Sequence, residues 1–540
     1  MASDVASSKD TRAALREMLE RGALYADRFP PSLRDALDVP DPLTEPVAAA
    51  LMERKSVVLS GNAGDGKSHL AQRALDTLPS RSCIQVTSDH PVTEPIPADA
   101  VVFVRDASAL TNAEVLSAVT AAHTAQAPLL ITINEGPLNS LAADPGGRFF
   151  QEVRDVLHAR ARGFAADDPD QMLILSLSGR QLAKSDFVEG ALSKLLPLVG
   201  PCSTCGTSRD CPRVVGARAL KRSRRARERV AALLQLLTDR GRHVSAREIW
   251  LFLTDMFFAW TCTPGQDEVD RAAGYFWERL FAPDNRLSRE IALEFDPINA
   301  PMAREDILLW QGKFDELDYD QDFAGLAPAS AARDSREDGL RLFASAKRAY
   351  FFMSKSIDPQ SLLARQSLAP DFGRLLTTAS SDPRRVIREL VGLINRYRLD
   401  ARTENDLWVS RHHSMAAHRR PFALAAATKL PIERLDISVP FAFENAAYKS
   451  AGFFPDRLLL RWTGSEQVLA VSFDTWRRLQ EERSLTVDRD QEGLDFALDL
   501  FMSQAPATAL EDPEVHFYDH ERQEEIVIRL KPADRSIELL

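Results

Sequence analysis

The chain has 540 residues, 45% of them hydrophobic and 27% charged, a globular composition that excludes a disordered chain. Its net charge of −11 excludes nucleic-acid binding through overall charge, so such a site would have to be a local basic patch. No apolar run reaches the roughly 20 residues that span a bilayer, and the polar first residues lack a signal-peptide core. With an odd set of five cysteines, these features predict a reduced cytoplasmic protein with no membrane contact.

Changes in residue pattern divide the chain into segments, as its length leads us to expect. The predicted segments are an N-terminal helical lead-in (1–48), a core of alternating strands and helices (49–180), a cysteine-bearing loop with a helical lid (181–265), a helical domain (266–400) and a C-terminal α+β module (401–540). A long surface loop is expected at 301–337, which is rich in Asp, Gly, Ala and Pro.

The stretch Gly61–Ser68 fits the pattern G-x-x-x-x-G-K-S/T of a phosphate-binding loop. It follows an apolar run and precedes a helical pattern, which is the context that the motif requires. Glycines allow a tight turn with inward N–H groups, Lys67 would contact the β- and γ-phosphates of ATP, and Ser68 would bind Mg²⁺. The alternative is a glycine-rich turn with a chance Lys-Ser pair. The predicted nucleotide-binding residues are Gly61, Asn62, Ala63, Gly64, Asp65, Gly66, Lys67, Ser68 and His69.

Apolar runs alternate with helical patterns throughout the segment 49–180, which favours a parallel sheet covered on both faces. The predicted strands are Val57–Leu59, Cys83–Thr87, Ala100–Val104, Leu129–Ile133 and Met172–Leu177. Five strands with a phosphate loop after the first match the strand count of an AAA+-type core. The predicted fold class is therefore α/β, with a parallel five-stranded AAA+-like core, a helical lid region and a C-terminal α+β module.

Asp106 stands at the end of the third predicted strand, in the form of a Walker B strand, and is predicted to act on Mg²⁺. Position 107, where a catalytic Glu usually follows, is Ala. The alternative role for Asp106 is to cap the turn that it begins.

The fourth strand ends in Asn134 and Glu135. We expect Asn134 to act as a sensor of the γ-phosphate or the attacking water, and Glu135 to serve as the missing catalytic base. Two alternatives stay open: this strand is itself the Walker B strand and Asp106 is structural, or both residues form a simple turn. In each case the side chains lie at the carboxyl end of a parallel sheet, where ligands bind.

Arginines that could stabilise phosphoryl charge are Arg180, directly after the fifth strand, and Arg247. Ser245 is predicted to cap a helix that runs to about Phe258, which places Arg247 early in a lid helix, as a sensor-2 group would be. A further set could act across the interface of a homo-oligomer: Arg148, Arg154, Arg160 and Arg162, in and beside a helix predicted at 149–161. The alternative for each of these arginines is that its side chain is simply solvated.

The spacing of Cys202, Cys205 and Cys211 suits metal thiolates, and zinc is the favoured metal. A fourth ligand would have to come from elsewhere; the candidates are Cys262, His243 and Cys83. Iron–sulfur ligation is less favoured without a fourth clustered cysteine, and the remaining alternative is an irregular loop with free thiols.

A basic run at 218–229 and a second basic cluster at 412–420 could contact nucleic-acid phosphates. Their alternative is a solvated surface balanced by acidic residues.

Five short motifs occur in one order along residues 50–260: the loop at 61–70, Val104–Ser108, Ile133–Gly136, the cysteine set with Pro212, and Val244–Glu248. In this series the chain resembles the ATPase subunit of bacterial phosphorothioation-dependent DNA restriction systems and its relatives in phage-defence gene clusters. The resemblance implies an AAA+-like ATPase that works with partner proteins on foreign DNA. It also implies that Lys67 and Ser68 bind the nucleotide and Mg²⁺ and that Asp106 binds the metal. Asn134 would be the sensor residue, and the three cysteines would form a structural knot.

The predicted function is an ATP-hydrolysing motor or switch in such a multi-protein defence system. The alternative is a nucleotide-gated scaffold or sensor with little turnover that recognises a protein through its C-terminal module. A third, less favoured hypothesis is a phosphotransferase that acts on a small substrate.

Overall fold

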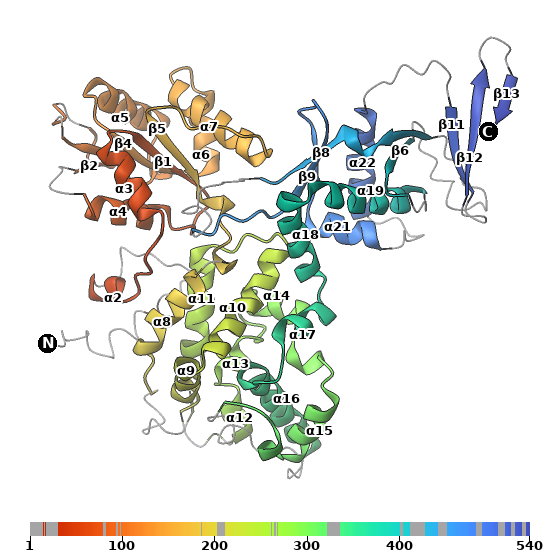
Figure 1. The fold of residues 1–540 in the computed structure, drawn as a ribbon. Helices are drawn as coiled ribbons and strands as arrows, with labels where there is room; N and C mark the ends of the chain where they lie inside the picture. Colours follow the sequence, from red (N-terminus) through yellow and green to blue (C-terminus); the bar gives the residue numbers. More distant parts are fainter. Residues whose placement is uncertain are drawn as a thin grey trace.

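The computed structural model has three parts, seen in Figure 1 as a sheet domain in red to orange, a helical part in yellow to green, and a C-terminal part in teal to blue. It describes residues 15, 17, 31–78, 83–92, 95–97, 99–184, 186–201, 211–260, 262–263, 266, 268–320, 335–399, 403–410, 427–440, 451–481, 489–505, 514–519, 524–531 and 536–540. Most of the predicted lead-in and the second basic cluster lie outside these residues.

A five-stranded, all-parallel sheet forms the first part, in the order β2-β3-β4-β1-β5. Its strands are β1 Ser56–Ser60, β2 Cys83–Val86, β3 Val101–Val104, β4 Leu129–Ile133 and β5 Met172–Ser176. Every residue of β1, β3 and β4 is buried, as a parallel sheet between two helical layers requires. The predicted α/β class and five parallel strands are confirmed.

Helices cover both faces of this sheet, and alternate side chains of each strand face opposite layers. Val57 and Leu59 of β1 pack with α3 and α4, whereas Val58 packs with α5, α6 and α7. A capping box of Thr111 and Glu114 begins α5. The helices and short 3₁₀ turns of this part are α2 Pro31–Ala36, α3 Thr44–Met52, α4 Lys67–Asp76, η2 Ala107–Ala109, α5 Asn112–Thr124, α6 Glu135–Ala143, α7 Arg148–Ala161 and η3 Leu177–Gly179.

The helical part packs around the largest hydrophobic cluster, which includes the fully buried Trp277. Its elements are η4 Leu182–Lys184, α8 Phe187–Leu195, η5 Leu196–Leu198, α9 Pro212–Arg222, α10 Arg224–Asp239, α11 Ala246–Phe258, α12 Glu268–Ala272, α13 Phe276–Arg279, α14 Arg286–Glu294, η6 Pro297–Asn299, α15 Ala303–Gln311, η7 Phe314–Glu316, α16 Arg336–Met353 and α17 Pro359–Gln366.

The expectation of a long loop at 301–337 was wrong for its first part, which forms α15. Leu308 and Leu309 of α15 are buried, and Asp306 forms an ion pair of 2.8 Å with Lys347 of α16. The apolar side chains of this short stretch therefore dock it on a neighbouring helix, despite its many loop-forming residues.

The C-terminal part combines two antiparallel sheets with helices. The last two helices of the predicted helical domain, α18 and α19, pack with these strands in one hydrophobic cluster. The predicted hairpin around Gly464 is present, and this glycine has a φ of 82°. The elements are α18 Ala369–Ser381, α19 Pro383–Leu399, β6 Asp406–Ser410, β7 Ala427–Pro431, η10 Ile432–Arg434, β8 Leu435–Ser438, β9 Leu458–Trp462, β10 Val468–Val471, α21 Phe473–Gln480, α22 Arg489–Ser503, β11 Glu514–Asp519, β12 Glu524–Lys531 and β13 Ser536–Leu539.

Crossing a bilayer demands a helix of sufficient length and apolar character, and none of the helices in the described ranges has both.

We expect two adjacent glycines in the turn between α6 and α7 to differ strongly in how well they tolerate alanine. A Cβ on Gly147 would lie 1.9 Å from the carbonyl oxygen of Leu141, whereas a Cβ on Gly146 would meet nothing closer than 3.7 Å. We expect Gly147→Ala to lower the free energy of unfolding by about 1–3 kcal/mol because the turn must shift. Gly146→Ala is the matched control and should stay within about 0.5 kcal/mol. Chemical denaturation of both variants measures this difference; equal effects would contradict the contact.

Candidate functional site

The glycine-rich loop, residues 61–68, joins β1 to α4 at the carboxyl edge of the sheet. Gly61, Gly64 and Gly66 have φ angles of 149°, 96° and 87°, which side chains other than hydrogen rarely allow. Gly66 immediately precedes α4, so its left-handed conformation directs the chain into the first turn of that helix. The loop therefore presents backbone N–H groups and a helix N-terminus together, as anion-binding loops do.

Lys67 folds back over its own loop. Its Nζ donates to the carbonyl oxygens of Gly61 at 3.0 Å and Asn62 at 2.7 Å, and the residue is 8% exposed. Burial lowers the pKa of the Lys67 ammonium, although the charges of Asp65, Asp106 and Glu135 oppose this shift. An ammonium held by two carbonyls in a partly desolvated loop is a cation that a phosphate group could take over.

The ends of β3 and β4 meet this loop through the carbonyl oxygen of Arg105. Ser68 Oγ donates to that oxygen at 3.4 Å, and Thr132 Oγ1 of β4 donates to it as well. Asp106 follows Arg105, and its Oδ1 accepts from the backbone N–H of Ser108 at 3.0 Å, so the residue caps the short turn η2. The capping role considered from the sequence is therefore present, and it uses one of the two carboxylate oxygens.

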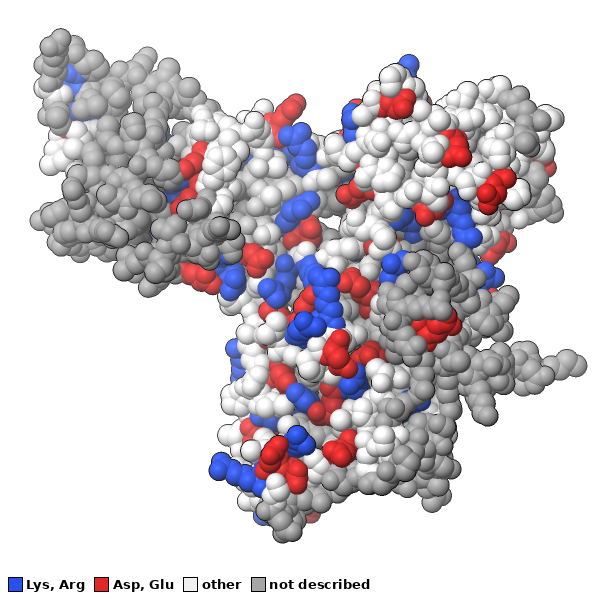
Figure 2. Space-filling view, turned by 180° about the vertical axis from the view of Figure 1, so that it is seen from behind, with Lys and Arg blue, Asp and Glu red and all other residues white. Residues whose placement is uncertain are grey.

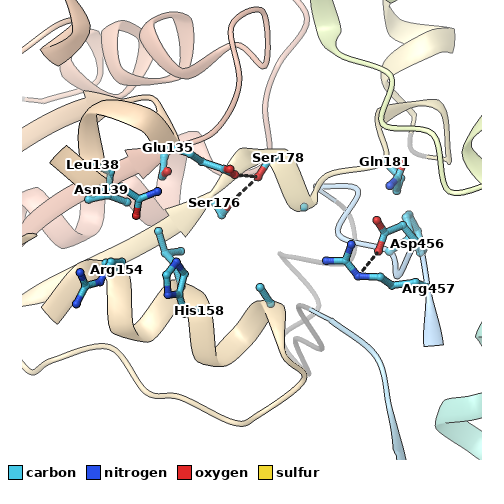
Figure 3. A pocket seen from close by; sticks show the side chains of 15 residues that line it. Glu135, Leu138, Asn139, Arg154, His158, Ser176, Ser178, Gln181, Asp456 and Arg457 are labelled. Carbon is cyan, nitrogen blue, oxygen red and sulfur yellow. Dashed lines mark hydrogen bonds and ion pairs between the residues drawn. The ribbon is translucent and has the colours of Figure 1, made fainter. Parts of the chain in front are cut away.

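Asn134 and Glu135 lie at the neighbouring strand end, as predicted. Asn134 Nδ2 donates to Ser108 Oγ at 2.8 Å, which links the ends of β3 and β4. Glu135 Oε1 accepts from Ser178 Oγ at 3.1 Å, and Ser178 Oγ in turn lies 2.8 Å from Ser176 Oγ at the end of β5 (Figure 3). These contacts bring the carboxyl ends of β3, β4 and β5 together beside the loop.

A second element, α11, holds the loop from the helical part. Ser245 forms the predicted N-cap of this helix, in a capping box with Glu248. The backbone N–H of Arg247 donates to the carbonyl oxygen of Gly64 at 3.1 Å. The positive charge of Arg247 also contributes to lowering the pKa of Lys67. The structure thus brings Arg247 to the loop, about 180 residues away in sequence.

Asp65 of the loop is anchored by His243. The carboxylate is 2% exposed; one oxygen lies 2.7 Å from His243 Nε2 and the other accepts from the Asn62 N–H at 2.6 Å. Sequence reasoning offered His243 only as a zinc ligand. Its position two residues before the helix cap, in the segment that faces the loop, was the one available signal of its contact with Asp65.

Two predicted residues have other partners. The buried guanidinium of Arg180 forms an ion pair with Asp41 at 2.8 Å and donates to the carbonyl oxygen of Ala451 at 2.7 Å. His69 Nε2 lies 2.8 Å from Asp38 Oδ1, on the side of the loop toward α2. Arg180 thus joins the sheet domain to the C-terminal part, and His69 joins α4 to the segment after α2.

Of the predicted cysteine set, only Cys211 lies within the described residues; Cys202 and Cys205 lie outside them. Cys211 is buried in a small cluster with Cys262, next to Trp260. Within the described ranges there is no group of three or more His, Cys, Asp or Glu side chains that could hold a metal. Zinc stays a prediction; Cys262, one of the three candidates for a fourth ligand, lies in the same small cluster as Cys211.

The basic run at 218–229 is divided between the surface and internal contacts: Lys221, Arg222 and Arg224 are exposed, whereas Arg229 is buried. Arg229 is 1% exposed and donates to the carbonyl oxygens of Phe351 and Ile357, and burial together with the charge of Arg225 lowers its pKa to about 10. Arg227 pairs with Glu189 at 2.6 Å. Blue and red side chains alternate over the face of the molecule in Figure 2. The exposed members of the run fit the solvated alternative, whereas the burial of Arg229 was not expected from the sequence.

No protein-family model, curated protein or solved structure matches the chain.

The Asp65–His243 contact predicts a pH dependence. Burial disfavours the charged imidazole, but the hydrogen bond and charge of Asp65 outweigh this and raise the pKa of His243. A raised pKa stabilises the folded protein below the unfolded value, and this contribution is lost as pH rises through the folded pKa. We expect His243→Ala to lower the free energy of unfolding more at pH 6 than at pH 9, with a loss of about 1.5–3 kcal/mol at the lower pH, as measured by chemical denaturation at both pH values. His158→Ala, at an exposed histidine, is the control; a pH-independent loss would contradict the assignment.

Proposed function

We propose that this chain is an ATP-binding and ATP-hydrolysing AAA+-type motor or switch in a multi-protein system that restricts foreign DNA. The observation that carries the proposal is the position of the glycine-rich loop. It follows β1 at the carboxyl edge of a parallel sheet, with the ends of β3, β4 and β5 beside it. The order places β4 between β1 and β3, an arrangement that resembles an AAA+-type sheet.

The loop residues fit a nucleotide triphosphate. The N–H groups of the loop and of the first turn of α4 would receive phosphate oxygens. Lys67 would exchange its two loop carbonyls for the β- and γ-phosphates, a replacement of neutral acceptors by charged ones. His243 and Arg247 hold Asp65 and Gly64 in place, so that the loop stays in shape when the phosphates arrive.

The donors for Mg²⁺ would be the hydroxyl of Ser68, which contacts the Arg105 carbonyl, and the carboxylate of Asp106, the next residue in the chain. Both are hard oxygen ligands of the kind that Mg²⁺ prefers. When bound, Mg²⁺ would neutralise charge that develops on the phosphates. On this proposal Asn134 orients the γ-phosphate or the attacking water, and Glu135 accepts the proton of that water.

Lys67→Ala tests nucleotide binding. We expect it to abolish saturable binding of ATP, because the loop loses the one side-chain cation that its own carbonyls hold. Lys55→Ala is the matched control, since Lys55 lies at the opposite end of β1 with a 39% exposed side chain. Titration of a fluorescent ATP analogue measures both; unchanged affinity in the Lys67 variant would overturn the proposal.

Asp106 and Glu135 can be separated by isosteric changes. Asp106→Asn keeps the N-cap, because Asn caps as well as Asp, but it removes the negative charge. We expect the enhancement of ATP affinity by Mg²⁺ to fall at least tenfold in this variant.

Glu135→Gln should lower kcat by about 10²-fold or more, while the affinity for ATP is retained. Turnover with radiolabelled ATP is the readout. Tight binding with negligible turnover that ignores Glu135→Gln would support a nucleotide-gated scaffold instead.

The restriction role is tested by adding DNA to the turnover assay. A rate that rises with double-stranded DNA and disappears in Lys67→Ala supports a motor that acts on DNA. A rate that ignores DNA, with or without candidate protein partners, would argue against this part of the proposal.

A further inference from the structure

One face of α19 carries four exposed arginines: Arg384, Arg385, Arg388 and Arg396. Since successive residues of a helix are about 100° apart, the four lie within about 120° around its axis. The other side of α19 packs into the hydrophobic cluster of the C-terminal part, where Leu390 is fully buried (Figure 1). The helix is therefore held in place with this arginine face toward solvent.

The four side chains of the arginine face form no ion pair within the part of the chain that the structure describes. In contrast, the fifth arginine of α19, Arg398, is buried and pairs with Asp499 at 2.8 Å. Arg286, an exposed arginine of α14, pairs with Glu290 one turn along its helix. The arginine face thus concentrates positive charge in a chain whose net charge is −11.

The start of α19 places this charge where it opposes helix stability. Arg384 and Arg385 stand in the first turn, which has no acidic residue, and the helix dipole disfavours cations there. Arg388 follows Arg384 by four residues, a spacing at which like charges repel. The Asp382 carboxylate, which accepts from the Arg385 N–H at 3.2 Å, offsets part of this cost. Such conflicts with local stability are expected at functional surfaces.

The chemistry of the arginine face fits phosphate groups. Guanidinium groups bind phosphate oxygens in pairs, with a geometry that lysine lacks. None of the exposed large hydrophobic side chains in the described ranges lies on α19. The face therefore lacks the apolar centre of a protein interface and the apolar side of a membrane-bound helix.

The length of the arginine face fits a duplex. Arg384 and Arg396 are twelve residues apart, which corresponds to about 18 Å along the helix axis. The major groove of DNA is about 12 Å wide. Arginines near the two ends of α19 could therefore reach phosphates on both edges of one groove.

One exposed carboxylate, Glu404, lies within the arginine face. A Cβ on Gly392, midway between Arg388 and Arg396, would lie 3.0 Å from Glu404 Cγ. Glu389 lies at the margin of the face and is half-buried. A phosphate chain along this face would be repelled by Glu404, so we expect moderate affinity.

From these observations we propose that the arginine face of α19 binds the phosphate backbone of double-stranded DNA, independently of base sequence. This surface gives the DNA part of the proposed function, on which it rests, a place on the molecule, and it needs neither ATP nor Mg²⁺. The four arginines are not contiguous in the sequence, so only the helix gathers them on one side.

The test measures fluorescence anisotropy of a short labelled duplex of arbitrary sequence, titrated with the full chain in the absence of nucleotide. We expect a Kd of about 1–100 µM near physiological salt, as for sequence-independent binding. The logarithm of the affinity should fall with the logarithm of the salt concentration with a slope of about −3, because three or four phosphates are neutralised. No binding, or binding that ignores salt, would overturn the proposal.

Variants locate the surface. The double variant Arg384→Gln with Arg388→Gln should weaken binding about tenfold and reduce the magnitude of the salt slope by about 2. Its melting temperature should not fall, because it removes cations from the helix start. Glu404→Gln should strengthen binding about threefold, since it removes the repelling charge. Unchanged affinity and salt slope in the double variant would overturn the proposal.

Two controls separate this surface from other sites. Arg286→Gln removes an arginine with a 75% exposed side chain that is paired with Glu290, and it should bind DNA as the unmodified chain does. Lys67→Ala should also bind DNA normally, so that a failure of ATP binding and a failure of this surface are distinct results.

Polyglutamate distinguishes DNA from an acidic protein partner. Because guanidinium groups match the phosphate backbone along the whole face, unlabelled duplex should displace the labelled duplex at least tenfold better than polyglutamate at equal charge concentration. Equal displacement by polyglutamate would indicate an acidic protein segment as the partner and would overturn the proposal.

Discussion

The parallel direction of five strands is the constraint on which the candidate site depends. Because β1, β3, β4 and β5 all end at one edge of the sheet, the residues that follow them are brought together without any sequence proximity. Asp106, Asn134 and Ser178 come from separate strand ends and are joined by hydrogen bonds through Ser108 and Glu135. An antiparallel arrangement of the same strands would place alternate ends on opposite edges.

The glycine-rich loop depends on a second part of the chain for its shape. Its backbone carries three left-handed or unusual glycine conformations, and its buried carboxylate, Asp65, would be costly without a partner. His243 and the N–H of Arg247 supply these contacts from the start of α11. A change in the position of α11 would therefore act on the loop directly, which gives the helical part a physical route to the candidate nucleotide site.

The C-terminal part contacts the same region from another side. The buried Arg180 donates to the Ala451 carbonyl while it pairs with Asp41, and the Gln181 N–H donates to the Gly452 carbonyl. After α7, the ring centre of Phe164 lies 4.7 Å from the guanidinium carbon of Arg461 in the C-terminal part. The segment after β5 is thus in contact with both the strand ends and the C-terminal part, and a cavity of about 250 Å³ lies at this junction (Figure 3).

The sequence by itself determined the local features of this protein. The apolar runs located the five strands, the glycine pattern located the loop, and Ser245 located the start of α11, because each depends on residues near in the chain. Only the tertiary structure decided which side chains meet. It placed His243 within hydrogen-bond distance of Asp65 and paired Arg180 with Asp41. It also buried Arg229 of the basic run and formed α15 where a loop was expected. These outcomes rest on contacts between distant segments, which packing selects and local propensity does not encode.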